Sequence, residues 1–171
     1  GCFGLTEPGA GSDASNMSTH AVDKGDHYLV NGTKTFITNA EYGDFIVAIT
    51  KTNPERGARG LTALILEKGQ FKVSKHEDKL GMRASNTCEL VIQDAVVPKD
   101  RIVGKPGQGF IIAMSALNGG RIGAAAQAVG MMQAMLDDSV AYAKERVQFG
   151  KNIGSQQAIQ WMIAEMAADL N

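Results

Sequence analysis

The sequence predicts an α+β chain with more than one domain, in which an antiparallel β-barrel is followed by the first helices of an α-helical bundle. Short apolar runs separated by turn residues fill the chain up to about residue 104. Beyond residue 108, apolar residues recur at three- and four-residue steps, the period of one helix face. Hydrophobic residues make up 44% of the 171 residues, enough for a sizeable core. We therefore expect a β-barrel over residues 1–104 and a partial helical bundle over residues 105–171.

The predicted strands follow one another between residues 28 and 97. The runs 28–30 and 35–38 flank Asn31-Gly32, which is typical of a hairpin turn because both residues tolerate positive φ. Further apolar runs lie at 45–49, 61–66 and 90–97, and a polar segment with Pro and Gly separates the first two. Many short strands in succession favour an antiparallel barrel or sandwich.

Two helices are predicted after the strands. The first runs from about residue 109 to about 146, and small residues such as Gly119, Gly120 and Gly123 crowd its middle. Glycines destabilise an isolated helix, so they make sense if another helix or a ligand comes very close. The second helix is expected to start near Ser155, which would be its N-cap. Two helices cannot bury both apolar stripes alone, so further helices are implied.

Composition excludes several classes of protein. The net charge of -1 argues against a nucleic-acid surface, which needs clustered positive charge. Cys2 and Cys88 match no metal spacing and indicate reduced thiols in a reducing compartment. No apolar run reaches the length of a membrane span. The chain begins without an initiator Met or signal peptide and stops within a helical pattern, so we expect a piece of a longer protein.

A Gly-rich segment at residues 5–13 is the first candidate motif. Its glycines would let the backbone approach a planar ligand closely, and Thr6 and Ser12 offer hydroxyls. It lacks the Gly-Lys-Ser/Thr ending of a phosphate-binding P-loop. Taken alone, the segment is equally consistent with a tight surface turn.

Four further segments gain meaning mainly from their order. Segment 34–40 alone indicates a strand, and segment 79–87 alone indicates nothing specific. In segment 117–121, Arg121 stands on the small-residue face, where it either needs an anionic partner or reaches solvent. Segment 146–150 would be an ordinary helix C-terminus, in which Arg complements the dipole and Gly ends the helix.

In this order and spacing the five segments resemble the acyl-CoA dehydrogenase family over nearly the whole chain. Residues 6–13 resemble its first signature, which is highly specific. Residues 36–38 resemble its aromatic-Ile-Thr segment beside the flavin, with Phe36 where several members carry Trp. The run from Gly119 to Gly123 is most similar to the short-chain, or butyryl-CoA, branch.

The resemblance implies a site for FAD and acyl-CoA between a barrel and a helical bundle. By similarity, residues 3–12 and 36–38 would line the isoalloxazine, Ser12 would also lie near the acyl-CoA, and segment 146–157 would reach the FAD of a neighbouring subunit. The implied FAD-binding residues are Phe3, Leu5, Thr6, Gly11, Ser12, Phe36, Ile37, Thr38, Arg146, Gln148, Phe149, Gln156 and Gln157. The implied substrate-binding residues are Ser12, Asn118, Gly119, Gly120 and Arg121, and no metal site is implied.

The resemblance also implies a reaction, namely α,β-dehydrogenation of an acyl-CoA, with short chains favoured. A glutamate removes the α-proton and the β-hydrogen leaves as hydride to flavin N5. Family members carry this base just before the Arg of the fourth segment or on a later loop. Gly120 occupies the first position, so the base is expected beyond Asn171 and residues 1–171 alone should be inactive. Glu7 belongs to the flavin loop and is not assigned as base.

The resemblance implies electron-transferring flavoprotein as the redox partner and a homotetramer as the assembly. The implied location is the bacterial cytoplasm or, as the second choice, the mitochondrial matrix. Two alternatives keep the same fold. One is an acyl-CoA oxidase that passes electrons to oxygen, and the other is a non-catalytic scaffold.

Overall fold

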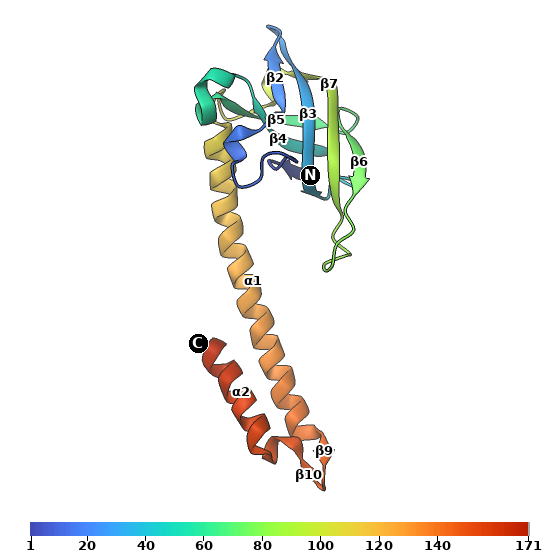
Figure 1. Ribbon diagram of the computed structural model, residues 1–171, viewed down its shortest axis with the longest axis vertical. Coiled ribbons are helices and arrows are strands. Elements are labelled where there is room, and N and C mark those ends of the chain that lie inside the picture. The colour runs from blue at the N-terminus through green and yellow to red at the C-terminus, as the bar shows by residue number, and fades with distance from the viewer. Residues whose placement is uncertain (171) are drawn as a thin grey trace. The chain divides into compact units, whose positions relative to one another are not determined.

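A computed structural model describes residues 1–170 and contains two compact units (Figure 1). The β unit comprises Gly1–Ala116, and the helical unit begins at Leu117. The division falls inside the long helix α1, Gly109–Glu145, whose first turns therefore belong to the β unit. The domain boundary expected after residue 104 stays a prediction.

Eight strands of the β unit form one sheet in the order β6-β7-β3-β2-β4-β5-β8, with β1 beside β4 (Figure 1). The sheet is mixed, because β1 runs parallel to β4 and β2 meets β4 in parallel at one residue pair. Among residues 1–170, β6 and β8 are the strands at the two ends of this order, and they do not pair with each other. The strands are β1 Cys2–Gly4, β2 His20–Asp23, β3 His27–Thr38, β4 Phe45–Lys51, β5 Leu61–Glu67, β6 Lys72–His76, β7 Thr87–Pro98 and β8 Ile102–Val103.

Apolar side chains from the inner face of this sheet form the core. The fully buried members include Val30, Ile46, Leu64, Leu90 and Val97, which come from the four strands β3, β4, β5 and β7. Short 3-10 helices fill connections at Ala14–Asn16, Pro54–Gly60 and Lys99–Arg101. The predicted fold class, an antiparallel β-barrel domain followed by the first helices of a bundle, is confirmed, although β1 and β2 each pair with β4 in parallel. The strands expected at 45–49, 61–66 and 90–97 are confirmed as well.

The hairpin expected at Asn31-Gly32 is wrong, because β3 runs through both residues without a break. A β-bulge lies there instead, where the register against β7 shifts. Asn31 bridges the bulge: its Nδ2 donates to Asp94 Oδ1 at 3.1 Å, and its Oδ1 accepts from the Asp94 amide at 2.8 Å. Gly32 is required by a close approach, since a Cβ there would lie 2.6 Å from Thr19 Cα.

The hairpin turn lies instead between β2 and β3. Asp23 Oδ1 accepts from the Gly25 amide at 2.8 Å, and Gly25 has a φ of 97°, which glycine adopts without strain. In the sequence, the residues after Asp23 indicate a hairpin turn less strongly than Asn31-Gly32 does. The turn nevertheless forms there, because β2 pairs with β3 in antiparallel register.

The helix predicted to start at Gly109 is confirmed as α1, Gly109–Glu145. A Cβ on Gly109 would lie 2.7 Å from the Thr62 amide nitrogen, so α1 begins in backbone contact with β5. Ala113, one turn later, is fully buried.

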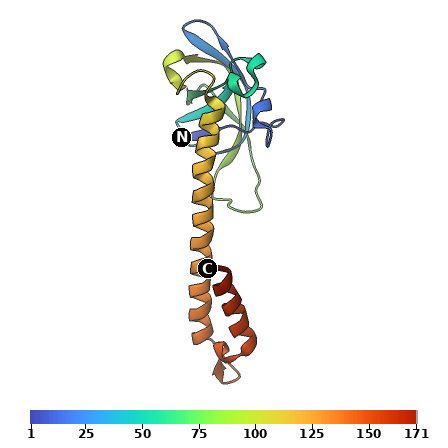
Figure 2. The ribbon, with the colours of Figure 1, turned by 90° about the vertical axis from the view of Figure 1, so that its left-hand side faces the viewer.

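In the helical unit, α2 (Gln157–Leu170) runs back along the C-terminal part of α1 (Figure 2). The two-residue strands β9 (Val147–Gln148) and β10 (Lys151–Asn152) and a 3-10 turn at Ile153–Ser155 connect the helices. Ser155 is not the N-cap expected of it, because its Oγ donates to the Asn152 carbonyl at 2.7 Å and α2 begins two residues later. No helix within residues 1–170 combines the length and hydropathy that a membrane crossing requires.

The contact between Gly32 and Thr19 gives a stability prediction. Gly32→Ala should lower the free energy of unfolding by about 1–3 kcal/mol, because the new methyl group must push apart β3 and the segment before β2. Gly81→Ala is the matched control, since nothing lies within 4 Å of a Cβ there. Urea unfolding measures both, and equal stability of the two variants would contradict the assignment.

Candidate functional site

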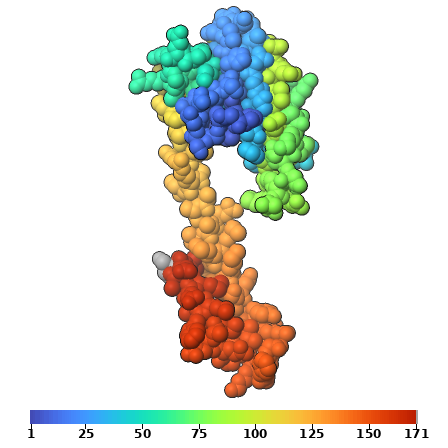
Figure 3. All heavy atoms as spheres, viewed as in Figure 1, coloured from blue at the N-terminus to red at the C-terminus, as the bar shows by residue number. Residues whose placement is uncertain are grey.

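The Gly-rich segment follows β1 and is fixed to β3 at its first residues. The Thr35 amide donates to the Thr6 carbonyl at 2.9 Å. A tight turn follows, in which Glu7 and Ala10 exchange backbone hydrogen bonds of 3.0 and 3.1 Å. Gly11 is exposed, and nothing lies within 4 Å of a Cβ placed on it. Figure 3 shows this N-terminal part of the chain, dark blue, at the surface of the β unit.

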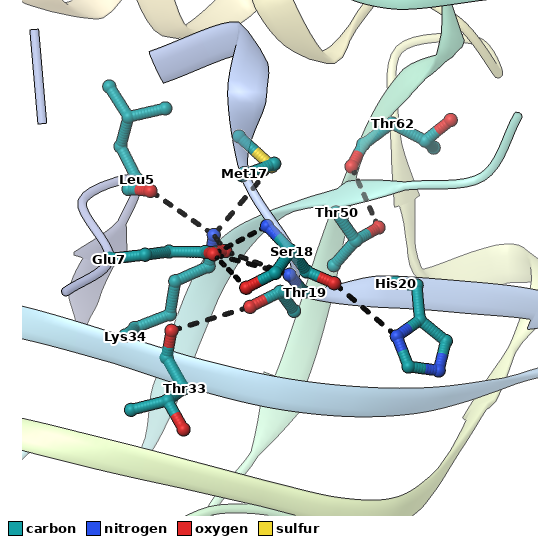
Figure 4. A network of polar contacts seen from close by, with 10 residues as sticks. All are labelled: Leu5, Glu7, Met17, Ser18, Thr19, His20, Thr33, Lys34, Thr50 and Thr62. Carbon is teal, nitrogen blue, oxygen red and sulfur yellow. Dashed lines mark hydrogen bonds and ion pairs between the residues drawn. The ribbon is translucent and has the colours of Figure 1, made fainter. Parts of the chain in front are cut away.

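Glu7, a residue of the Gly-rich segment, forms a buried ion pair with Lys34 of β3 (Figure 4). Lys34 Nζ lies 2.8 Å from Glu7 Oε1, and the exposed fractions of the two side chains are 0% and 2%. Lys34 Nζ also donates to the Leu5 carbonyl at 3.1 Å. The pair therefore ties β3 to the segment at two of its residues.

The carboxylate of Glu7 also accepts hydrogen bonds from the segment that precedes β2. The Ser18 amide and Oγ donate to Oε2 at 2.6 and 2.7 Å, and the Thr19 amide donates to Oε1 at 3.0 Å. Burial by itself would raise the pKa of Glu7, but the Lys34 charge and these hydrogen bonds lower it to about 2. Burial lowers the pKa of Lys34, and Glu7 opposes that shift. Glu7 is thus an ionised structural residue, and both of its carboxylate oxygens accept hydrogen bonds.

A second β-bulge follows Lys34 and displays Phe36. Lys34 pairs with Leu90 and Ile37 pairs with Cys88, so β3 carries one residue more than β7 between these positions. Phe36 has a φ of 58° and an exposed fraction of 63%. An aromatic residue in the left-handed region is strained, and such strain clusters at functional sites. The structure thus marks Phe36 independently of any sequence motif.

The other residues predicted in the β unit fall into two groups. Leu5 and Ile37 are buried, with exposed fractions of 8% and 2%, so only their backbone atoms can face a ligand. Thr38 and Ser12 are exposed, and Phe3 and Thr6 are partly exposed. The hydrogen bond between Thr35 and Thr6 brings the Gly-rich segment and the end of β3 together, as the prediction requires.

Asn86 holds the turn that follows β3, a role that the sequence did not indicate. Its carbonyl accepts from the Asn39 amide at 3.0 Å, and its Nδ2 donates to Glu41 Oε2 at 3.1 Å. Asn86 closes the segment 79–87, in which Lys79 Nζ donates to the carbonyls of Met82 and Ser85 at 2.9 and 2.6 Å. That segment is therefore a braced loop beside the end of β3.

The predicted substrate-binding residues of the helical unit lie on an exposed part of α1. Arg121 Nη1 donates to Asn118 Oδ1 at 2.6 Å, one turn apart on the helix. Nothing lies within 4 Å of a Cβ placed on Gly119 or Gly120, so this stretch leaves room for a close approach. The Arg121 side chain is exposed, so it is accessible to an anionic partner as well as to solvent.

The predicted FAD-binding residues after α1 surround a tight hairpin. Phe149 and Gly150 form its turn, with φ angles of 54° and 76°, and Phe149 is 97% exposed. The Ile153 amide donates to the Arg146 carbonyl at 2.9 Å and closes the base of the hairpin. Phe149, like Phe36, is an exposed aromatic residue held at positive φ, which suits a side chain presented to a partner.

The structural role of Lys34 was not predicted from the sequence. The available signal was a charged residue within a strand of otherwise apolar and Thr side chains, and such a residue must be paired if it faces the core.

Within residues 1–170, no group of three or more His, Cys, Asp or Glu side chains could hold a metal ion. Cys2 and Cys88 are free, buried thiols.

Two family models match the chain, one over most of its strands and one over its helices. Residues 2–95 match the family model described as acyl-CoA dehydrogenase, middle domain. Residues 107–171 match the model described as acyl-CoA dehydrogenase, C-terminal domain.

Three individual proteins show the degree of similarity. A short-chain-specific acyl-CoA dehydrogenase of Clostridium acetobutylicum is 48% identical over 97% of this chain and 44% of its own length. The CarC subunit of the caffeyl-CoA reductase-Etf complex of Acetobacterium woodii is 49% identical over 98% of this chain and 45% of its own. The structure of butyryl-CoA dehydrogenase from Megasphaera elsdenii superposes with a TM-score of 0.93 at 47% identity, over 99% of this chain and 45% of that one. The chain thus spans under half the length of these relatives.

Acid unfolding tests the ion pair. Glu7 has a pKa of about 2 in the folded chain against an ordinary 4.5, so its contribution to stability is complete above the higher value and is lost as the pH falls toward the lower one. That shift corresponds to about 3 kcal/mol. Urea unfolding at a series of acid pH values should show this loss in the wild-type chain and not in Glu7→Gln/Lys34→Met. Parallel pH profiles for the two proteins would contradict the assignment.

Proposed function

Because the chain belongs to the acyl-CoA dehydrogenase family, we propose that the complete gene product containing it is an FAD-dependent enzyme that dehydrogenates an acyl-CoA thioester between its α and β carbons. One observation carries the proposal. The Gly-rich segment and the strained, exposed Phe36 lie on adjacent backbone segments, which are joined by the Thr35–Thr6 hydrogen bond. An open glycine backbone beside an exposed aromatic ring suits a planar ligand.

The β-unit residues fit a flavin ring. Nothing stands within 4 Å of a Cβ on Gly9 or Gly11, so a flat ring could approach the backbone. We assign Thr6, Gly11 and Ser12 to one side of the ring and Phe36 and Thr38 to another, with Phe3 beside them. Leu5 and Ile37 would contribute backbone groups only, since their side chains are buried. FAD, on which members of this family depend, supplies the hydride acceptor.

The α-proton requires a base, and the best-placed carboxylate near the flavin loop cannot serve. Glu7 is buried and fully hydrogen-bonded, and its pKa of about 2 makes it a poor proton acceptor at neutral pH. Gly120 has no side chain to offer. We therefore place the base outside the residues assigned to the site.

The proposed substrate is a short-chain acyl-CoA, whose CoA part would contact Asn118, Gly119, Gly120 and Arg121. Support comes from the similarity to the short-chain-specific dehydrogenase of Clostridium acetobutylicum and to butyryl-CoA dehydrogenase of Megasphaera elsdenii. Arg121 is the cation of this group, and a guanidinium pairs well with phosphate.

The proposed assembly is a homotetramer with electron-transferring flavoprotein as redox partner. In it, the hairpin would reach the FAD of a neighbouring subunit through Arg146, Gln148, Phe149, Gln156 and Gln157. The exposed, preorganised Phe149 supports a contact to another molecule. The Acetobacterium woodii relative, a subunit of a complex named for Etf, supports the partner.

The same relative favours a second candidate, which is reduction of an enoyl-CoA. The chemistry is the reverse reaction on the same flavin, so the site residues keep their roles. The acyl-CoA oxidase alternative differs only in that oxygen accepts the electrons.

Spectroscopy of the purified complete gene product tests the function. It should show flavin absorbance, and anaerobic butyryl-CoA should bleach that absorbance. If electron-transferring flavoprotein reoxidises the reduced flavin quickly and air reoxidises it slowly, the protein is a dehydrogenase. If air reoxidises the reduced flavin quickly, the protein is an oxidase. Faster turnover with an enoyl-CoA and a reductant would favour the reductase. A protein that binds no flavin, or whose flavin no acyl-CoA bleaches, would contradict the proposal.

Substitution of Arg121 tests the CoA contact. Arg121→Ala should raise the KM for butyryl-CoA by an amount equivalent to roughly 2 kcal/mol, because a charged hydrogen bond to the substrate is lost. Flavin content should not change. Lys144→Ala is the matched control, since it removes another exposed cation from α1. An unchanged KM in Arg121→Ala would leave the residue as a surface charge.

A further inference from the structure

Two consecutive residues of β3 hold two consecutive carbonyls of the Gly-rich segment. Lys34 Nζ donates to the Leu5 carbonyl at 3.1 Å, and the Thr35 amide donates to the Thr6 carbonyl at 2.9 Å. The next residue along β3 is Phe36, at the bulge. The segment and the strained residue are thus anchored at the same place.

Glu7 extends this anchor to a third stretch of chain. It binds Lys34 on one side and the Ser18 and Thr19 amides on the other. Thr19 in turn donates from Oγ1 to the Thr33 carbonyl at 3.4 Å, which returns to β3 just before the anchor. The contacts form a closed circuit, so the Gly-rich segment cannot shift against β3 without breaking several buried hydrogen bonds.

The circuit accounts for the conformation of Phe36. An L residue keeps a φ near 58° only where its surroundings over-determine it. On one side of Phe36, Lys34 and Thr35 are fixed by the circuit; on the other, Ile37 is buried in the core at 2% exposure. A charge pair is a poor source of stability compared with apolar residues of equal size, so a positional role suits it better.

We propose that the Glu7–Lys34 pair positions the flavin-facing surface: it fixes the Gly-rich segment on β3 and holds Phe36 in its left-handed conformation. The inference rests on the proposed function for the identity of the planar ligand only. Glu7 and Lys34 act through the segment and Phe36, and they touch neither flavin nor substrate.

Glu7→Gln/Lys34→Met in the complete gene product is the direct test, because it removes both charges at nearly constant volume. The FAD dissociation constant should rise about tenfold, the change produced by 1.4 kcal/mol of lost preorganisation. The visible circular dichroism of bound flavin should change, and a crystal structure should show Phe36 with negative φ. Thr50→Val, which removes a buried hydrogen bond to the Thr62 carbonyl in the same sheet, should change none of the three.

Glu7→Asp provides a second test if the double variant fails to fold. It keeps both charges but shortens the carboxylate side chain by one methylene, so the flavin dichroism and FAD affinity should change in the same direction by a smaller amount. A double-mutant cycle with Phe36→Gly should be non-additive, because glycine adopts positive φ without help.

Normal flavin affinity, dichroism and Phe36 φ in a folded double variant, or in Glu7→Asp, would overturn the proposal. Wild-type protein without flavin would instead refute the proposed function. The φ of Phe36 in crystals of wild type and variants would then still decide whether the pair holds that residue.

Discussion

The buried ion pair between Glu7 and Lys34 is the interaction on which the candidate site depends. It joins three parts of the chain: the Gly-rich segment, strand β3, and the residues Ser18 and Thr19 that precede β2 (Figure 4). Two charges removed from water are costly unless every remaining donor and acceptor is satisfied. Here the carboxylate accepts from Ser18, Thr19 and Lys34, and among the described residues no buried side-chain nitrogen or oxygen lacks a partner.

Backbone strain and exposure coincide at two aromatic residues, one in each unit. Within residues 1–170, Phe36 and Phe149 are the two aromatic residues with positive φ, and both are largely exposed. Each lies next to a fixed element: the anchored part of β3 for Phe36 and the closed hairpin for Phe149. A rigid base with a displayed aromatic ring is suited to binding, since little conformational freedom remains to be lost.

The sequence predicted the strands and helices better than it predicted the turns. Apolar runs located β4, β5 and β7, because these strands supply much of the buried core, and the three- and four-residue spacing of apolar residues located α1. The prediction failed at Asn31-Gly32, where a close approach to Thr19, and not a turn, requires the glycine. Lys34 and Asn86 were missed because their roles depend on partners remote in sequence. The site residues came from resemblance, and the structure independently distinguishes Phe36 and Phe149 among them.

We infer that the Gly-rich segment and the end of β3 form one flavin-binding surface. A crystal structure of the complete gene product with bound FAD tests it most directly. Isoalloxazine atoms should lie within about 4 Å of both the Thr6–Ser12 backbone and the Phe36–Thr38 segment. A flavin ring bound elsewhere, or one that contacts only one of the two segments, would contradict it.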